Sequence, residues 1–201
     1  YNKNKKMKLK SLFLAVLLLA PLASVAQDSA ASGLSLPKWA LKTNVAYWGT
    51  ATPNLGIEVG LSRKLTLDVE SGYNMFSFSK GKKWRHWMVT PELRWWMCDR
   101  FNSHFFGVHA IGGEYNVNRL GFNDHTKKNR YEGYMLGGGL SYGYHWVFRK
   151  RWAVEAELGV GYLHLDYDRY DCRKCGNYAS HEIRNLFTVT RLGINVIYLL
   201  K

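Results

Sequence analysis

The sequence lacks the long apolar runs from which membrane-spanning helices are built. Its one sustained apolar stretch, Leu12 to Ala20, is too short to cross a bilayer as a helix, which needs about 20 residues. Proline is scarce, with 4 residues in 201, and no linker, charge block or low-complexity tract follows about Leu36. These absences argue against a helical membrane protein and predict a single folded domain.

Cysteine is also rare, with 3 residues. Cys172 and Cys175 form one Cys-x-x-Cys pair, whereas a zinc site needs about four ligands and no second pair is present. A zinc site that recruits nearby histidine or aspartate stays open as an alternative, but a local disulfide is the expectation for an exported protein. Cys98 is left over, either as a free buried thiol or as an intermolecular partner. No metal or other cofactor is expected.

Acidic residues are fewer than basic ones, 15 against 28, for a formal net charge of +13. This balance is typical of nucleic-acid-binding proteins, but the start of the chain predicts export. Met7 to Ala26 has a lysine-rich start, an apolar centre and the small-x-small cleavage motif Ser24-Val25-Ala26. Cleavage there removes five lysines and leaves 23 basic against 15 acidic residues, a net charge of +8. An anionic membrane surface is therefore the expected partner, and nucleic acid is not.

The expected organisation has three parts. Residues 1–26 are a signal peptide with an extension before Met7, residues 27–38 a short periplasmic lead-in, and residues 39–201 a β-domain in the outer membrane. No cysteine follows the cleavage motif, so a lipoprotein is not expected.

After the lead-in, apolar and polar residues alternate with a period of two, which indicates β-strands. We expect strands at 39–48, 54–61, 65–75, 86–97, 104–117, 134–146, 152–162 and 191–198. Short connections alternate with longer polar ones at Ser77–Arg85, Asn118–Arg130 and Asp168–Arg184. An even strand number and this alternation predict an all-β fold, an eight-stranded antiparallel up-and-down transmembrane β-barrel. Pro91, inside the fourth strand, predicts a bulge.

One face of each strand is apolar and aromatic, and the other carries glycine and charge. A membrane barrel turns the apolar face outward, whereas a soluble lipid-binding barrel would turn it inward. Glycines on the polar face favour the membrane, since the interior of an eight-stranded barrel has little room. So do aromatic residues near the strand ends, which are typical of interfacial girdles: Trp95, Trp146 and Trp152 at one rim, Trp87 and Tyr134 at the other.

The last strand has a further feature. Arg191, Gly193, Val196 and Tyr198 have the spacing of the C-terminal signal by which outer-membrane barrels are recognised for insertion. The barrel-insertion machinery is therefore an expected partner.

Charged residues on the polar faces of the strands are expected to meet inside the barrel. Buried charges must be paired, so we interpret them as a salt-bridged plug, with a narrow ion or proton path as the alternative. These residues are Glu58, Asp68, Glu70, Glu92, Arg94, His145, Glu155, Glu157 and Arg191.

The long connections offer two further hypotheses. Their basic residues would lie at the height of lipid A phosphates, which arginine can bind with two parallel hydrogen bonds, so lipopolysaccharide is an expected contact. The residues concerned are Lys80, Lys82, Lys83, Arg85, Lys127, Lys128 and Arg130. Ser180 and His181 are the only adjacent Ser-His pair there, and they carry the alternative of a lipid A-modifying enzyme. Because such a pair arises easily by chance, no catalytic residue is expected.

Several motifs carry a resemblance. Lys42-Thr43-Asn44, Tyr47-Trp48, Thr50 to Gly56 and Glu58 form the first block, and Lys83-Trp84-x-His86-Trp87, Arg100-Phe101-Asn102, Tyr131-Glu132-Gly133 and Leu140 to Tyr144 form later ones. With these blocks the chain resembles a family of small Bacteroidetes outer-membrane proteins known only as a domain of unknown function. The resemblance implies an outer-membrane barrel, often encoded near fimbrial subunit genes, and no catalytic residues. A structural or accessory role is the expected function, and the resemblance points to surface fibre or adhesin assembly. The alternatives are a lipid A-modifying enzyme, a small-solute pore and a soluble lipid-binding barrel.

Overall fold

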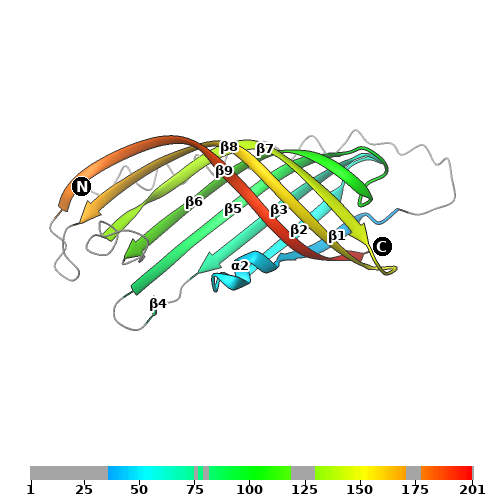
Figure 1. Cartoon of the computed structure of the whole chain (residues 1–201), viewed down its shortest axis with the longest axis horizontal. Coiled ribbons are helices and arrows are strands. Elements are labelled where there is room, and N and C mark those ends of the chain that lie inside the picture. Colours follow the sequence, from blue (N-terminus) through cyan, green and yellow to red (C-terminus); the bar gives the residue numbers. More distant parts are fainter. Residues whose placement is uncertain (1–35, 75–76, 79–81, 119–129, 171–177, 201) are drawn as a thin grey trace. The chain divides into compact units, whose positions relative to one another are not determined.

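The computed structural model describes residues 36–74, 77–78, 82–118, 130–170 and 178–200 (Figure 1). The elements are β1 (Trp39–Asn44), α2 (Val45–Gly49), β2 (Asn54–Gly60), β3 (Leu65–Asn74), β4 (Ser77–Phe78), β5 (Lys82–Trp96), β6 (Ser103–Asn118), β7 (Arg130–Val147), β8 (Trp152–Tyr170) and β9 (Tyr178–Leu200). Within this part of the chain, no helix is long and apolar enough to cross a membrane.

The strands form one antiparallel sheet in the order β3-β2-β1-β9-β8-β7-β6-β5-β4, and β3 also pairs with β5. Eight strands therefore close into a ring, while the two-residue β4 only adds to the β3–β5 hairpin. Consecutive strands are neighbours all the way round. The prediction of an all-β fold with eight antiparallel strands in up-and-down order is confirmed.

Several strand boundaries differ from the prediction, and β5 and β7 each begin four residues earlier than expected. The first strand ends at Asn44 rather than continuing to residue 48, because the Asn44 side chain accepts a hydrogen bond from the Ala46 amide and caps the helix α2. At the other end of the sequence, β8 and β9 reach Tyr170 and Tyr178, so most of the connection expected at Asp168–Arg184 is strand. Cross-strand pairs maintain this extension although its apolar alternation is weak.

The prediction of a bulge at Pro91 is wrong. Pro91 pairs with Val69 in an unbroken β3–β5 register. The β5–β6 ladder omits Thr90 and Pro91 and resumes at Glu92 in the same register. Proline lacks the N–H that a ladder needs, and here the missing donor removes pairs without inserting a residue.

A bulge occurs instead in β9. Gly159 pairs with Arg191 but Val160 pairs with Val189, which leaves Thr190 as an extra residue. Thr190 and Arg191 therefore both turn their side chains inward, where the Thr190 hydroxyl lies 2.8 Å from Nε2 of the buried His109. Bulges re-aim side chains in this way, and this one turns Thr190 inward beside Arg191.

The ring has an inverted distribution of polarity. Charged and amide side chains fill its interior, and large apolar side chains cover its outer surface. Leu140 on β7 and Val108 on β6, for example, are 64% and 61% exposed, whereas Glu58, Asp68 and Arg94 are fully buried. The apolar faces of the strands thus point outward.

Glycines make room for the large interior side chains. A Cβ on Gly56 would lie 2.5 Å from Cγ of Lys42, and one on Gly159 would lie 2.9 Å from Cβ of Arg191. A Cβ on Gly107 would meet the carboxylate of Glu92 and the hydroxyl of Ser141. Interiors of this size tolerate little added volume, so the glycines and the long charged side chains depend on one another.

Gly107→Ala is expected to lower the free energy of unfolding by about 1–3 kcal/mol, the usual cost of overpacking a filled interior. The matched control is Gly112→Ala on the same strand, whose Cβ would have its nearest neighbour at 3.9 Å. Urea unfolding followed by tryptophan fluorescence measures both variants. Equal stabilities of the two would contradict the packing argument.

Candidate functional site

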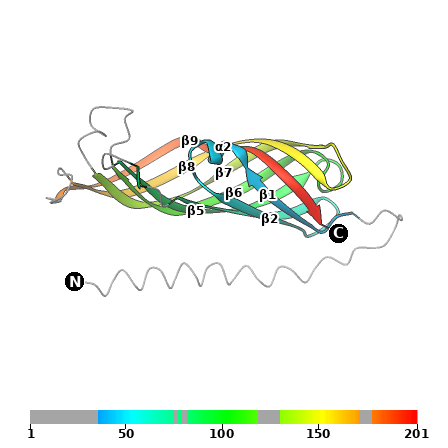
Figure 2. The same ribbon diagram turned by 90° about the horizontal axis from the view of Figure 1, so that it is seen from below.

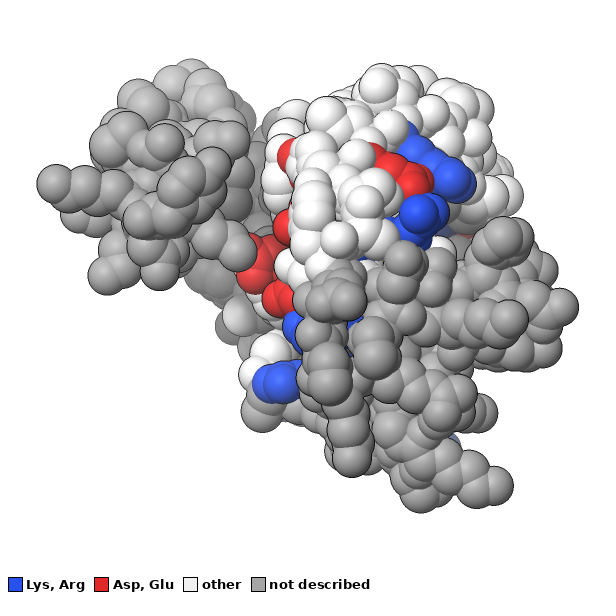
Figure 3. All heavy atoms as spheres, turned by 90° about the vertical axis from the view of Figure 1, so that its left-hand side faces the viewer, with Lys and Arg blue, Asp and Glu red and all other residues white. Residues whose placement is uncertain are grey.

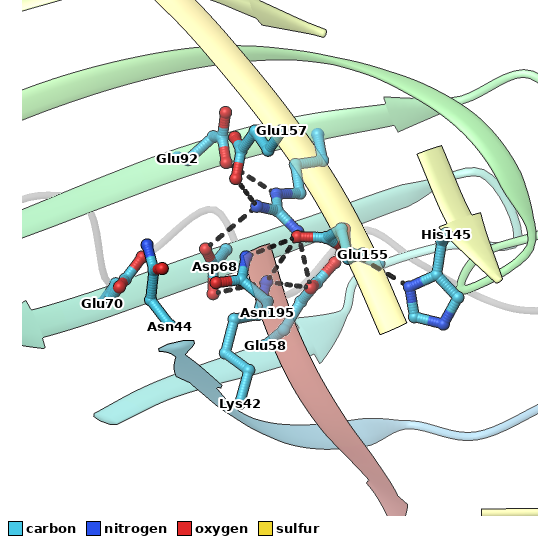
Figure 4. Close-up of polar contacts among 12 residues, drawn as sticks. Lys42, Asn44, Glu58, Asp68, Glu70, Glu92, His145, Glu155, Glu157 and Asn195 are labelled. Carbon is cyan, nitrogen blue, oxygen red and sulfur yellow. Dashed lines mark hydrogen bonds and ion pairs between the residues drawn. The ribbon is translucent and has the colours of Figure 1, made fainter. Parts of the chain in front are cut away.

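The interior of the ring holds a network of ion pairs, which we call the interior network (Figure 4). All nine charged or titratable residues that the sequence places inside lie there, each no more than 6% exposed. They come from β2, β3, β5, β7, β8 and β9. Lys42 of β1 joins them at 2% exposure, and sequence reasoning missed it as an interior cation.

Arg94 is the centre of the interior network. Its guanidinium is fully buried and contacts carboxylates of four different strands. The shortest oxygen–nitrogen distances are 2.6 Å to Glu92, 2.9 Å to Glu157, 3.0 Å to Glu58, 3.1 Å to Glu155 and 3.3 Å to Asp68. The five donors of a guanidinium suit it to this multiple role.

The other two cations complete the interior network on either side. Lys42 Nζ lies 2.8 Å from Glu58 and 3.2 Å from Asp68. Arg191 lies 2.7 Å from Asp68, 2.8 Å from Glu157 and 3.2 Å from Glu70. Asp68 thus contacts all three cations and links the two sides of the network.

Six carboxyl groups face only three cationic side chains, so neutral donors take up part of the acceptor capacity. Thr66 donates to Glu58 at 2.5 Å, Asn195 donates to Glu155 at 2.9 Å, and Ser141 donates to Glu92. Nδ1 of His145 lies 3.4 Å from Glu155, beside which the sequence placed it. Charges removed from water are tolerable only with such hydrogen bonds.

The interior network is closed towards the end of the ring that carries the short turns at 61–64, 97–102 and 148–151, which we call the short-turn end. An apolar cluster fills this end, with Trp96, Phe101 and Phe105 at its centre. The Trp96 and Phe105 rings lie 4.9 Å apart, and the Arg94 guanidinium stacks 4.4 Å from the Phe105 centroid. Arg100 ties the entering chain to this end by donating to the carbonyls of Pro37 and Ser62 at 2.8 and 2.9 Å.

The first block of the resembling motifs has a structural explanation. Asn44 and Asn54 bind each other through amide and carbonyl groups at 2.6 and 2.9 Å, which joins the ends of β1 and β2. The same block supplies Lys42 as a cation of the interior network, Gly56 as the position that leaves space for its side chain, and Glu58 as its partner. These residue types at this spacing build a closed hairpin and one side of the interior network.

The Ser180–His181 pair does not form a catalytic dyad. The two residues are neighbours on β9, and their side chains point to opposite faces. The Ser180 hydroxyl donates to Glu182, while Nδ1 of His181 lies 3.0 Å from Asp168. The hydrogen bond from the Tyr167 hydroxyl lowers the pKa of Glu182, which also binds Arg169 at 3.1 Å.

The remaining sequence candidates are scattered. Arg85 is exposed, and Arg130 binds Glu132 at 2.5 Å. Lys82 and Lys83 lie in β5, whereas Lys80, Lys127, Lys128, Cys172 and Cys175 lie outside the described residues. Cys98 is exposed in the turn after β5, which rules out the buried thiol. No cluster suited to a metal ion occurs among the described histidine, cysteine, aspartate and glutamate residues.

The four residues of the predicted insertion signal divide between the two faces of β9. Arg191 and Gly193 are buried on the inner face. Val196 and Tyr198 lie on the outer face, where the Tyr198 ring packs 5.0 Å from that of Trp152.

Arg94→Met is expected to lower the free energy of unfolding by about 3–5 kcal/mol, because it leaves several buried carboxylates without their main cation. Arg63→Gln is the matched control, since Arg63 makes an exposed pair with Asp99 at 2.6 Å and such pairs contribute little. Urea unfolding of both variants gives the comparison. An Arg94→Met protein as stable as Arg63→Gln would show that the interior network does not hold the ring together.

Comparison with known proteins identifies a family for this chain. The model of the family described as "Protein of unknown function (DUF3575)" matches residues 12–200. No curated protein and no solved structure matches the chain. Because the family model covers nearly the whole sequence, the chain belongs to the DUF3575 family.

Proposed function

We propose that this chain is an outer-membrane β-barrel protein with a non-enzymatic, structural or accessory role at the cell envelope. The observation that carries the proposal is the apolar outer surface of the ring. Large hydrophobic side chains on all eight strands of the ring are exposed, among them Leu93, Leu140 and Leu192 at 44%, 64% and 57%. A continuous apolar surface of this kind is unfavourable in water and is what a bilayer accommodates.

Aromatic side chains at both limits of this surface support the proposal. Trp39, Trp95, Trp146 and Trp152 are exposed near the short-turn end, and Trp48, Tyr73, Tyr134 and Tyr162 are exposed nearer the opposite one. Such rings prefer the boundary between lipid and water. With the predicted signal peptide, the short-turn end would face the periplasm and the opposite end the exterior.

The filled interior supports a structural role over a pore or an enzyme. The central carboxylates and Arg94 are fully buried against one another, and charges that are paired and desolvated in this way oppose the passage of a solute. Ser180 and His181 have separate partners, so the alternative of a lipid A-modifying enzyme loses the pair on which it rested. A soluble lipid-binding barrel would need an apolar interior, and here the interior is charged.

Two partners belong to the proposal. Lipopolysaccharide phosphates would meet exposed arginines such as Arg85 near the exterior end. A surface fibre or adhesin is the second partner. This part of the proposal is an analogy, because it rests on the resemblance to proteins encoded near fimbrial genes.

The test of the proposal is electrophoresis of outer-membrane fractions with and without boiling. A folded membrane barrel withstands cold detergent, so the unboiled protein should migrate differently from the boiled chain and should be found in the outer-membrane fraction. Arg94→Met is the informative comparison, since its weakened interior should lower the temperature at which the shift is lost. Recovery of the protein in the soluble periplasm, with no shift, would overturn the proposal.

A further inference from the structure

The edge of β9 that faces β1 is unpaired over most of its length in the described part of the chain. β1 pairs only with residues 195–200 of β9, from Asn44↔Asn195 to Trp39↔Leu200. At Asn44, which pairs with Asn195, β1 ends and the chain turns into α2, which lies beside β9 (Figure 2). β9 itself continues to Tyr178, and among the described strands only β8 pairs with this part of it. We call residues Tyr178–Val189 on this side the free edge.

The contacts of Asn44 show which backbone groups point to this side of β9. Its side-chain amide donates to the Leu192 carbonyl at 3.1 Å, and its oxygen accepts from the Ile194 amide at 3.4 Å. Both residues face outward. The direction of the side chain and the direction of the backbone hydrogen-bonding groups alternate together along a strand. Between Tyr178 and the bulge at Thr190, the free edge therefore presents the amides and carbonyls of the outward-facing residues, namely Ile183, Asn185, Phe187 and Val189.

Unpaired backbone groups on a long strand call for a partner. Donors and acceptors that recur at every second residue match another extended backbone, which is the basis of recognition by strand addition. Proteins commonly protect such edges with lysine or proline, but Tyr178–Val189 contains neither. The part of the free edge near Val189 also borders the apolar surface, where backbone groups without a hydrogen-bond partner are costly.

Side chains beside the free edge define the chemistry of the partner. On the outer face, Ile183, Phe187 and Val189 are 57%, 75% and 54% exposed, and they fit a strand with apolar residues at alternate positions. Arg184 points to the other face with a side chain that is 67% exposed, and its contact with Glu182 is long, at 3.6 Å.

Glu182 has closer partners than Arg184. Glu182 also accepts from the Tyr167 hydroxyl at 2.8 Å and from Arg169 at 3.1 Å. Arg184 meets Glu182 only at this longer distance and can take a closer carboxylate from the incoming strand. Basic and acidic side chains lie close together at this end of the ring (Figure 3).

We propose that the free edge of β9 docks an extended segment of a partner protein as an additional antiparallel strand, with apolar residues at alternate positions and a carboxylate for Arg184. The proposal deepens the accessory role proposed above and rests on it for the location of the partner at the cell surface. Docking is measured on purified protein in detergent, independently of where the protein lies in the cell. The docking proposal can therefore fail while the membrane proposal holds, and the membrane proposal can fail while docking is observed.

The experiment uses a fluorescent peptide with the sequence of residues 160–170, the β8 segment that β9 already accepts on its other edge. Fluorescence anisotropy measures its binding to the full mature chain in detergent micelles, with a scrambled peptide as the reference. Asn185→Pro removes one edge amide and should weaken binding about tenfold. Asn185→Ala, which loses the same side chain but keeps the amide, should bind as the wild type does.

A second measurement does not depend on a variant. Hydrogen exchange of the wild-type protein should slow at Ile183, Asn185 and Phe187 when the peptide is added. Absence of peptide binding, equal binding by Asn185→Pro and Asn185→Ala, or unchanged exchange at these amides would each overturn the proposal. A wild-type dimer that Asn185→Pro converts to a monomer would assign the free edge to a second copy of the chain and would also overturn it.

Discussion

The burial of the Arg94 guanidinium among carboxylates is the interaction on which the rest of the structure depends. A full charge in the interior is tolerable only when it is paired and hydrogen-bonded, and Arg94 finds its partners on β2, β3, β5 and β8. The ring must therefore close before the charge is satisfied. Long-range charge pairing here takes the place that apolar packing holds in most proteins, and it leaves the apolar side chains for the outer surface.

Three local features follow from that constraint. Glycines stand where a Cβ would meet Lys42, Glu92 or Arg191. The β9 bulge adds Thr190 to the interior beside Arg191, and Arg191 reaches Asp68, the carboxylate that Arg94 and Lys42 also contact. The apolar cluster around Trp96 closes the short-turn end. Each feature is a departure from regular strand geometry or composition, and each serves the same interior network.

Much of this could be predicted from the sequence, because a period of two distinguishes the faces of a strand wherever one face is apolar. The ring order and the nine interior residues follow from that pattern. It fails where alternation weakens, as in the extension of β8 and β9, whose pairing depends on tertiary register. Lys42 was missed because a lysine near the start of a strand resembles a solvated residue. The inserted Thr190 was missed because the alternation of apolar and polar residues does not reveal a bulge. The free edge of β9 could not be foreseen, since it exists only because Asn44 caps α2 and ends β1 early.

The central claim is that lipid surrounds the apolar surface while the charges stay inside. It is tested most directly by nuclear Overhauser effects in nanodiscs between lipid acyl chains and labelled leucine methyl groups. Leu93, Leu140 and Leu192, which are exposed on three different strands, should all contact acyl chains and none should contact water. Water contacts at these methyl groups, with no acyl-chain contacts, would contradict the account.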